Sequence, residues 1–168
     1  MPSDLTIRRL KGPQEAEACA RVMSSSEPWV SLSRNYDHAI KSLTDRTREV
    51  FVAHVKDTLS GFIVINMGGP FSGYIQTVCV FPECRDQGVG RGLLKFAEKR
   101  IFRETPNVFL CVSSFNTDAQ RFYEQLCYKR IGEIEDYVVE GHSEFLMRKT
   151  LGPMVGYPAP ARKKRKTA

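Results

Sequence analysis

The sequence predicts an α/β (α+β) protein in which β-strands and α-helices follow one another along a chain of 168 residues. Short apolar or alternating runs indicate the strands, whereas apolar residues three and four positions apart indicate the helices. Glycine, proline and asparagine separate these runs, as is typical of turns and loops. The predicted order is β-α-α-β-β-β-α-β-α-β-β, and a chain of this length suits one domain with its own hydrophobic core.

The N-terminal part of the chain predicts one strand and two helices. Residues 5–10 alternate weakly between apolar and polar side chains, which indicates the strand. Pro13 suits the first turn of a helix, because the N–H that it lacks needs no partner there, and the helical spacing continues to Met23. The serine-rich segment 24–28 ends this helix, and residues 35–43 show the helical spacing again.

The next part of the chain changes to strand-like runs. Residues 50–55 and 59–65 are rich in apolar and β-branched side chains and flank the polar segment 56–58, so they predict a β-hairpin. Residues 66–70 contain adjacent glycines and a proline, which predict a loop. Residues 73–80 predict the following strand.

A glycine-rich turn connects that strand to a helix that reaches about Arg103. Gly88, Gly90 and Gly92 occupy alternate positions within residues 85–92. Such a turn exposes backbone N–H groups at the positive end of a helix dipole, which favours a phosphate or pyrophosphate. A tight turn that needs glycine for its geometry alone is the alternative. The spacing matches neither a Walker loop nor a dinucleotide-binding loop.

A buried strand and a capped helix are predicted next. Residues 108–112 form a short, continuous apolar run, as expected of a strand covered on both faces. Thr117 and Gln120 have the spacing of a capping box at the start of a helix that continues through Leu126.

Two final strands, at residues 128–139 and 143–149, complete a predicted single domain that spans residues 1–150. Residues 151–168 contain prolines and lack periodicity, so they predict a flexible basic tail. Residues 162–166 supply five of the 25 basic residues, and the 20 that remain nearly balance 19 acidic residues. Five of the six net positive charges therefore belong to the tail. A contact between this basic cluster and nucleic acid or the ribosome stays open as an alternative function.

Cysteine usage and hydropathy favour a cytoplasmic protein. The five cysteines show no disulfide framework, which indicates a reducing compartment. Cys79, Cys111 and Cys127 lie in apolar segments and are interpreted as small core residues. No apolar run approaches the roughly 20 residues that span a bilayer, and the N-terminus lacks the apolar region of a signal peptide. The sequence contains no cluster of metal-ligand residues, so no metal site is predicted.

Two segments carry a resemblance to a known family. Val78-Cys79-Val80 precedes the loop Arg85-Asp86-Gln87-Gly88-Val89-Gly90, and Asn116 precedes the helix segment Ala119-Gln120-Arg121-Phe122-Tyr123-Glu124. Together they resemble the cofactor loop and a neighbouring helix of the GNAT superfamily of N-acetyltransferases, and the resemblance spans residues 5–149. It implies the acyl-CoA N-acyltransferase fold, a mixed and largely antiparallel sheet of about seven strands flanked by about four helices. The fourth and fifth strands would splay apart to admit acetyl-CoA.

The resemblance also implies which residues contact acetyl-CoA. The backbone of the fourth strand would bond the pantetheine arm, Asn116 would hydrogen-bond the same arm, and the glycine loop would hold the pyrophosphate. The cofactor-binding residues implied in this way are Val78, Cys79, Val80, Arg85, Gln87, Gly88, Val89, Gly90, Arg91, Asn116 and Tyr123.

Tyr123 is the implied catalytic acid. It would donate a proton to the departing thiolate, a role that suits a phenol with a pKa of about 10. Packing beside Phe122 is the alternative role of this side chain. The glycine that ends this helix in the family is Cys127 here, so we expect the helix to be capped in a different way.

The general base that takes a proton from the amine stays open. Cys111 stands where relatives that acetylate protein N-termini carry a glutamate. Glu144 and His142 lie in the terminal hairpin, which in the family helps to wall the acceptor site. They are preferred over Glu27, Glu140 or a water molecule, although each alone is more often a surface group. The candidate substrate-binding residues are Glu27, Trp29, Tyr137 and His142.

The resemblance favours an N-acetyltransferase that moves the acetyl group of acetyl-CoA directly to a primary amine. The acceptor would be a small molecule, a protein N-terminus or a lysine. An acyl-CoA-binding regulatory module without transfer activity is the alternative from another class, and the presence of Tyr123 favours the enzyme. The identity of the amine and the formation of a homodimer stay open.

Overall fold

The computed structural model describes Pro2 and residues 4–158. Its helices and strands are β1 (Leu5–Arg9), α1 (Gly12–Ser24), α2 (Tyr36–Thr44), β2 (Glu49–Val55), β3 (Thr58–Asn66), β4 (Tyr74–Val80), α3 (Val89–Ile101), β5 (Asn107–Ser113), α4 (Thr117–Gln125), β6 (Lys129–Ile134) and β7 (Glu144–Thr150). A short 3-10 turn, η1 (Pro82–Cys84), lies between β4 and α3. The predicted order of strands and helices is confirmed. The basic cluster of the predicted tail lies outside the described residues.

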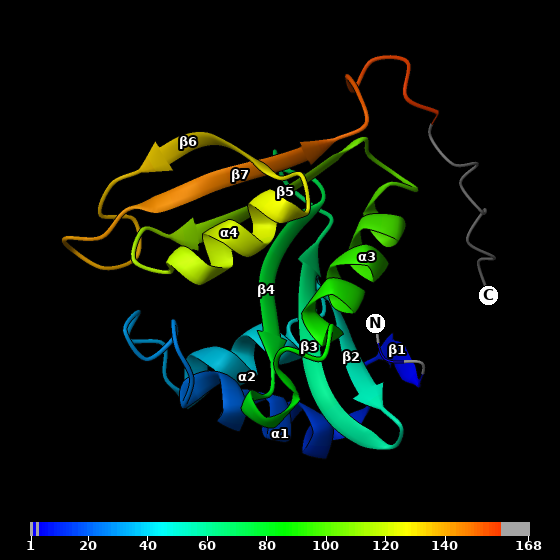
Figure 1. Ribbon diagram of the computed structural model, residues 1–168, viewed down its shortest axis with the longest axis vertical. Coiled ribbons are helices and arrows are strands. Elements are labelled where there is room, and N and C mark those ends of the chain that lie inside the picture. Colours follow the sequence, from blue (N-terminus) through cyan, green and yellow to red (C-terminus); the bar gives the residue numbers. More distant parts are fainter. Residues whose placement is uncertain (1, 3, 159–168) are drawn as a thin grey trace.

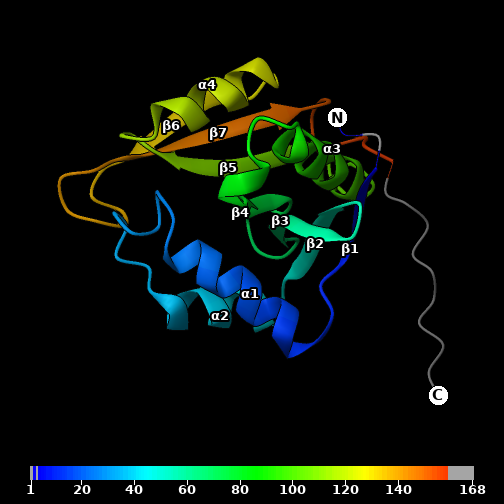
Figure 2. The same cartoon turned by 60° about the horizontal axis from the view of Figure 1, so that its bottom comes forward.

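The seven strands form one sheet in the order β1-β2-β3-β4-β5-β7-β6. Every neighbouring pair is antiparallel except β4 and β5, which run parallel. Figures 1 and 2 show α1 and α2 on one face of the sheet, and α3 and α4 on the opposite face. The prediction of a mixed, largely antiparallel sheet flanked by helices is therefore confirmed.

The core follows the apolar period of each element. In α3, buried side chains recur every four residues, at Val89, Leu93, Ala97 and Ile101. One face of α3 therefore packs against the sheet. The middle of β3, residues 60–65, is buried without interruption, because helices cover both faces of the sheet at its centre. Burial of these apolar side chains is the main term that stabilises the fold.

The sheet opens between β4 and β5. These strands pair only where Tyr74 faces Phe109 and Ile75 faces Leu110. Beyond these two pairs they diverge, as Figure 1 shows. The splay that the family resemblance implies is thus present, and it leaves the cleft-facing edge of β4 without a neighbouring strand from Gln76 onward.

A β-bulge marks the start of this divergence. Val64 of β3 pairs with Thr77, whereas the next residue, Ile65, pairs with Ile75. Gln76 is therefore an extra residue on β4. Because a bulge bends its strand and increases the local twist, Gln76 helps to turn β4 away from β5.

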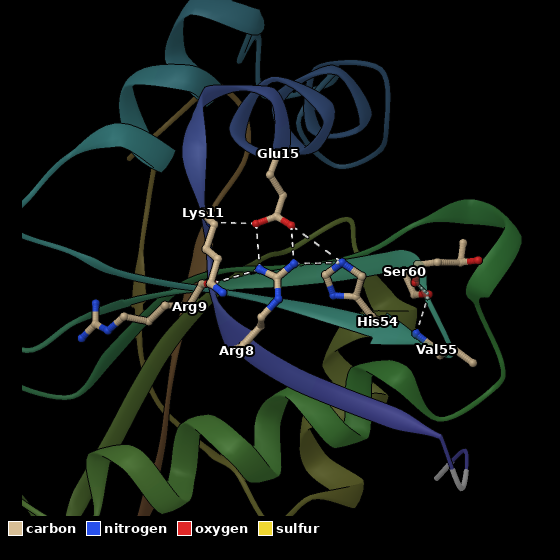
Figure 3. A network of polar contacts seen from close by, with 8 residues as sticks. Arg8, Arg9, Lys11, Glu15, His54, Val55 and Ser60 are labelled. Carbon is tan, nitrogen blue, oxygen red and sulfur yellow. Dashed lines mark hydrogen bonds and ion pairs between the residues drawn. The ribbon is translucent and has the colours of Figure 1, made fainter.

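An ionic network fixes the start of α1 to the first two strands (Figure 3). Arg8 on β1 donates from Nη1 and Nη2 to the two carboxylate oxygens of Glu15 in α1, at 3.0 and 2.7 Å. The backbone N–H of Lys11 donates to the same carboxylate at 2.7 Å, and Nε2 of His54 on β2 lies 3.7 Å from it. The hydrogen bonds from Arg8 hold the pKa of Glu15 below its usual value, against the opposing effect of burial.

The N-terminus of α4 differs from the prediction. Its cap is Asn116, whose Oδ1 accepts a hydrogen bond of 3.2 Å from the N–H of Ala119. The predicted capping box of Thr117 and Gln120 is wrong, since the Gln120 amide instead donates to the carbonyl oxygens of residues 113 and 114. Gln120 therefore ties α4 to the end of β5.

The C-terminus of α4 also corrects a prediction. Cys127 adopts the left-handed conformation, with φ of 67°. Its N–H donates to the carbonyl of Glu124, and the N–H of Tyr128 donates to the carbonyl of Tyr123, at 2.9 and 3.1 Å. These two bonds form a Schellman motif, the cap that glycine usually makes. The cap is therefore of the ordinary kind, and Cys127 is exposed rather than a core residue.

The predicted strand at residues 128–139 is too long. β6 ends at Ile134, and residues 135–143 form a loop. Asp136 adopts a positive φ of 48°, and its carboxylate accepts a hydrogen bond from the N–H of Gly141 at 2.6 Å. This closed loop places Tyr137 beside the cleft rather than on a strand.

Candidate active site

A cavity of about 700 Å³ occupies the opening between β4 and β5. It extends from the glycine loop before α3 to the segment between α1 and α2 and to the β6–β7 loop. Most of the residues that the sequence analysis selected lie along its wall. These residues are Glu27, Trp29, Val78, Cys79, Val80, Arg85, Gly88, Val89, Gly90, Arg91, Asn116, Tyr123, Tyr137 and Glu144.

Two selected residues lie away from the cavity wall. The exposed side chain of Gln87 donates from Nε2 to the carbonyl of Glu83 at 3.1 Å. His142 packs edge-on against Phe115, with 5.0 Å between ring centroids. The geometry therefore brings Glu144, but not His142, to the cleft.

The glycine loop presents free backbone donors to the cleft. Gly88 precedes α3 with φ of 81°, a left-handed conformation that glycine adopts without a Cβ clash. The first intrahelical bond runs from the N–H of Gly92 to the carbonyl of Gly88 at 3.0 Å. The N–H groups of residues 88–91 come before it and have no partner within the helix. Together with the helix dipole and the neighbouring Arg85 and Arg91, they have the character needed to bind an anion.

Gly90 keeps the cavity open between two side chains. A Cβ at this position would lie 3.3 Å from Cγ2 of Val80 and 3.5 Å from Cζ of Phe122. Both side chains line the cavity. The missing side chain therefore leaves space where β4, α3 and α4 approach one another.

The cleft-facing edge of β4 offers backbone hydrogen-bonding groups to an extended ligand. β4 pairs with β3 on its other side along its whole length. Beyond Ile75 it has no contact with β5 in the ladder. Residues 78–80 can therefore accept a ligand arm as an additional strand, in the manner of β-augmentation.

Tyr123 presents a neutral phenol to the cleft. It lies on α4 between Phe122 and Tyr128, with ring centroids 5.6 and 5.9 Å away. Burial raises the pKa of Tyr123 to about 12, because a phenolate is poorly solvated there. The hydroxyl makes no hydrogen bond within residues 4–158, so it is free to donate one to a ligand.

Glu144 is the buried carboxylate of the cleft. It is the first residue of β7, and it is 6% exposed. Burial raises its pKa, while a hydrogen bond from the Ser113 hydroxyl and the charge of Arg34 act in the opposite direction. A carboxylate with a raised pKa accepts a proton more readily than an ordinary one, as a general base requires.

Sequence reasoning missed several residues that surround Glu144. The cavity wall also contains Arg34, Tyr74 and Ser113. Burial raises the pKa of the Tyr74 hydroxyl, and the nearby Cys111 thiol adds to this effect. Alternation along β4 could have indicated Tyr74, since Tyr74, Gln76, Val78 and Val80 share one side of the strand. The positions of Ser113 and Arg34 in the cleft could be found only from the strand register and from the loop conformation, respectively.

The described residues contain neither a membrane-spanning helix nor a cluster of metal ligands. Within Pro2 and residues 4–158, no helix combines the length and apolarity needed to cross a bilayer. In the same part of the chain, no three His, Cys, Asp or Glu side chains come together as metal ligands.

The comparisons with known proteins identify the family. Residues 16–127 match the model described as the acetyltransferase (GNAT) family. This segment is more than half of the chain, so the chain belongs to the GNAT acetyltransferase family. The predicted family, and with it the prediction of an acetyltransferase, is confirmed.

Two relatives have related sequences. A protein of Saccharolobus solfataricus named N-alpha-acetyltransferase is 24% identical over 137 residues, which cover 73% of this chain and 82% of the relative. An uncharacterized protein of Mycobacterium leprae is 29% identical over 145 residues and matches 82% of this chain. This chain covers 38% of the length of the Mycobacterium leprae relative.

Two solved structures share the fold. A GNAT-family protein of Desulfovibrio desulfuricans superposes with a TM-score of 0.76 at 18% identity, covering 88% of this chain and 99% of that chain. A protein of Salmonella typhimurium, solved with its cofactor acetyl-CoA, has a TM-score of 0.70 at 15% identity. The match covers 94% of this chain and 99% of that chain. At these identities the likeness concerns the fold.

Proposed function

We propose that the protein is an N-acetyltransferase that moves the acetyl group of acetyl-CoA directly to a primary amine. The observation that carries this proposal is the content of one continuous cavity. Its wall combines an anion-binding loop, a neutral phenol at Tyr123 and a buried carboxylate at Glu144. These are the three groups that such a transfer needs: a donor site, an acid and a base.

The residues of the cleft fit acetyl-CoA. The unpaired N–H groups of residues 88–91 suit a pyrophosphate, and Arg85 and Arg91 add positive charge. The gap at Gly90 and the free edge of β4 suit a narrow, extended arm. When bound, acetyl-CoA would supply the activated acetyl group as a thioester.

Glu144 is proposed as the general base. A primary amine exists mainly as ammonium at neutral pH, and it needs to lose a proton before its nitrogen can attack a thioester. The raised pKa of Glu144 makes its carboxylate a better acceptor for this proton than an exposed glutamate. The Ser113 hydroxyl, 2.5 Å away, holds one carboxylate oxygen in place.

Tyr123 is proposed as the general acid. With a pKa of about 12, its hydroxyl stays protonated at neutral pH and can give its proton to a departing thiolate. The cap at Asn116 and the Schellman motif at Cys127 fix both ends of the short helix that carries it. The phenol is therefore held on a rigid support, as precise proton transfer requires.

The named relatives support an α-amino group as the acceptor. The protein of Saccharolobus solfataricus carries the name N-alpha-acetyltransferase. A cytoplasmic location is proposed as well, because all five cysteines, which lie within the described residues, are free thiols.

The proposal is tested in two measurements on the full chain. Isothermal titration calorimetry measures acetyl-CoA binding, and a thiol-reactive dye measures CoA release in the presence of a panel of primary amines. Amine-dependent thiol release, with an acetylated product in the mass spectrum, supports the N-acetyltransferase. Binding without transfer to any amine overturns it in favour of a regulatory acyl-CoA-binding module. Absence of acetyl-CoA binding overturns both readings.

A further inference from the structure

The end of the cleft at Glu27 and Glu144, where the amine would bind, is called the acceptor end. A second hollow, of about 550 Å³, lies beside it. The loop between α1 and α2, the helix α2 and the β6–β7 loop form most of its wall. We call it the basic hollow. The residues that line both the cleft and the basic hollow are Leu32, Arg34, Arg48, Gln76 and Val138. A ligand in the cleft can therefore extend into the basic hollow.

The charges of the basic hollow are unbalanced. Arg34, Lys41 and Arg48 carry positive charge, whereas Asp45 is the single carboxylate among its lining residues. Asp45 lies 3.2 Å from Nε of Arg48. Arg34 and Lys41 form no ion pair within the described residues. Two cations are thus available to an anionic ligand.

Arg48 is held in place by Asp45 and by a neutral hydrogen-bond partner, Ser42. Its Nη1 donates to Oγ of Ser42 at 2.8 Å, and Nε2 of Gln76 donates to the same oxygen at 3.3 Å. Ser42 is 7% exposed. The bulge residue of β4 is therefore connected to a guanidinium of the basic hollow. Such preorganisation lowers the entropy cost of binding an anion.

The carboxylates of the acceptor end lie on the cleft side. Glu27 and Glu144 line the cleft but not the basic hollow. Arg34 is close enough to Glu144 for its charge to lower the pKa of that carboxyl. The acceptor end is consequently bipolar, with negative charge where the ammonium group would bind and positive charge beyond it.

From this arrangement we propose that the acceptor amine carries an oxyanion, such as a carboxylate, close to its amino group. The amino group would face Glu144, and the oxyanion would be bound by Arg34, with Lys41 as the second unpaired cation of the basic hollow. Guanidinium groups suit this role because they bind carboxylates and phosphates through paired N–H donors. This inference rests on the proposed N-acetyltransferase and specifies its substrate class. Peptides with acidic residues after the N-terminal one and free amino acids, which carry an α-carboxylate, share this chemistry.

The test compares acceptors that differ only in charge. Initial rates of thiol release give kcat/KM for peptides that begin Ser-Asp-Glu, Ser-Asn-Gln and Ser-Lys-Lys, and for free alanine and alaninamide. We expect the carboxylate-bearing member of the preferred source to exceed its counterpart without that carboxylate by about tenfold or more, the worth of one charge-assisted hydrogen bond. The peptide and amino-acid arms then distinguish the two sources.

Arg34→Gln provides the residue-specific test. The Arg34 side chain makes no hydrogen bond or ion pair within the described residues, so this substitution is expected to leave the fold intact. It should reduce the ratio of acidic to neutral kcat/KM by about tenfold. Arg46→Gln is the matched control, because Arg46 is exposed in the same region and lines neither hollow. It should leave the ratio unchanged.

A binding measurement separates this inference from the proposed function. Fluorescence polarisation with a C-terminally labelled Ser-Asp-Glu peptide requires no catalysis. The inference is supported if the Ser-Asp-Glu peptide binds more tightly than the Ser-Asn-Gln peptide, and if Arg34→Gln weakens this binding whereas Arg46→Gln does not. Equal transfer to acidic and neutral acceptors, or preference for Ser-Lys-Lys, overturns it while the N-acetyltransferase stands. Transfer to no amine at all overturns both.

Discussion

The Ser113 hydroxyl donates a hydrogen bond of 2.5 Å to Oε1 of Glu144 from the position directly opposite on the neighbouring strand. Oε2 of Glu144 has no hydrogen-bond partner within residues 4–158. One carboxylate oxygen is thus fixed by the β5–β7 ladder, and the other is left for a ligand. This division suits a base that holds a constant position while it accepts a proton.

Replacing this base should remove most of the activity. We expect Glu144→Gln to lower kcat/KM for amine acetylation by about 10²- to 10⁴-fold, the usual contribution of a general base. Steady-state thiol release measures the effect. Glu140→Gln is the matched control, since Glu140 is an exposed candidate from the sequence that does not line the cleft. Equal activity of Glu144→Gln and wild type would exclude this role.

The raised pKa of Glu144 predicts opposite pH effects on activity and stability. Activity should rise with pH through a pKa above the ordinary carboxyl value of about 4.3, because only the carboxylate is a base. A raised pKa in the folded state also means that ionisation costs stability as pH rises. Glu144→Gln should therefore not lower the melting temperature at pH 7. A marked drop would indicate a structural role instead.

Tyr123→Phe should slow turnover without weakening the fold. The hydroxyl has no hydrogen-bond partner within the described residues, so its removal costs little stability. We expect kcat to fall by about 10²-fold or more, while the Kd of acetyl-CoA, measured by calorimetry, changes little. Because the pKa of Tyr123 is about 12, the wild type should show no alkaline loss of this acid below about pH 10. Unchanged kcat would remove the proton-donor role.

Gly90→Ala should weaken acetyl-CoA binding more than it affects stability. The added Cβ would stand between Val80 and Phe122 in the cavity wall, and we expect the Kd to rise about tenfold. Alanine favours the helix by up to about 1 kcal/mol, so the melting temperature should not fall markedly. Gly132→Ala is the control, as a Cβ there meets no atom within 4 Å. An unchanged Kd in calorimetry would contradict this placement of the cofactor.

Cys127→Gly should stabilise the protein. Cys127 holds the left-handed position of a Schellman motif, where a side chain costs about 1–2 kcal/mol. Glycine removes this strain but adds flexibility to the unfolded chain, which leaves a net gain of about 1 kcal/mol. Thermal unfolding should shift upward by about 2–4 °C. Cys127→Ala retains the strain and should show no such gain; an equal gain would assign the effect to the thiol.

Glu15→Gln should remove part of the acid sensitivity of the fold. The pKa of Glu15 is lowered in the folded state, so its contribution is complete above the unfolded pKa of about 4.3 and is lost as pH falls. Loss of the charge-assisted bonds to Arg8 should cost about 1–3 kcal/mol at pH 7. Urea unfolding at pH 7 and pH 3 should show that the cost shrinks at low pH.

Glu17→Gln is the control for that measurement. Glu17 pairs with Arg21 at 3.2 Å on the exposed side of the same helix. Its replacement should change the free energy of unfolding by less than about 0.5 kcal/mol. A cost for Glu15→Gln that stays constant with pH would show that the network of Figure 3 does not act through the ionised carboxylate.

Local patterns in the sequence were sufficient for much of the architecture. The helical spacing of apolar residues after the glycine-rich turn predicted α3, and the strand-like run at residues 73–80 predicted β4. The alternate glycines at 88, 90 and 92 predicted the turn that joins β4 to α3, although α3 already begins at Val89. Each of these signals lies within a few residues, and backbone geometry alone converts it into a helix, a strand or a turn.

The sequence by itself therefore determined the order of the elements and indicated most of the residues proposed for the donor side of the cleft. Tertiary structure decided the composition of the proposed acceptor side, where Arg34, Ser113 and Glu144 meet from a loop and two strands that are distant in the chain. The length of β6 and the cap at Cys127 were also decided by the folded chain. Strand register, loop closure and burial depend on contacts between distant segments, and no pattern of neighbouring residues contains them.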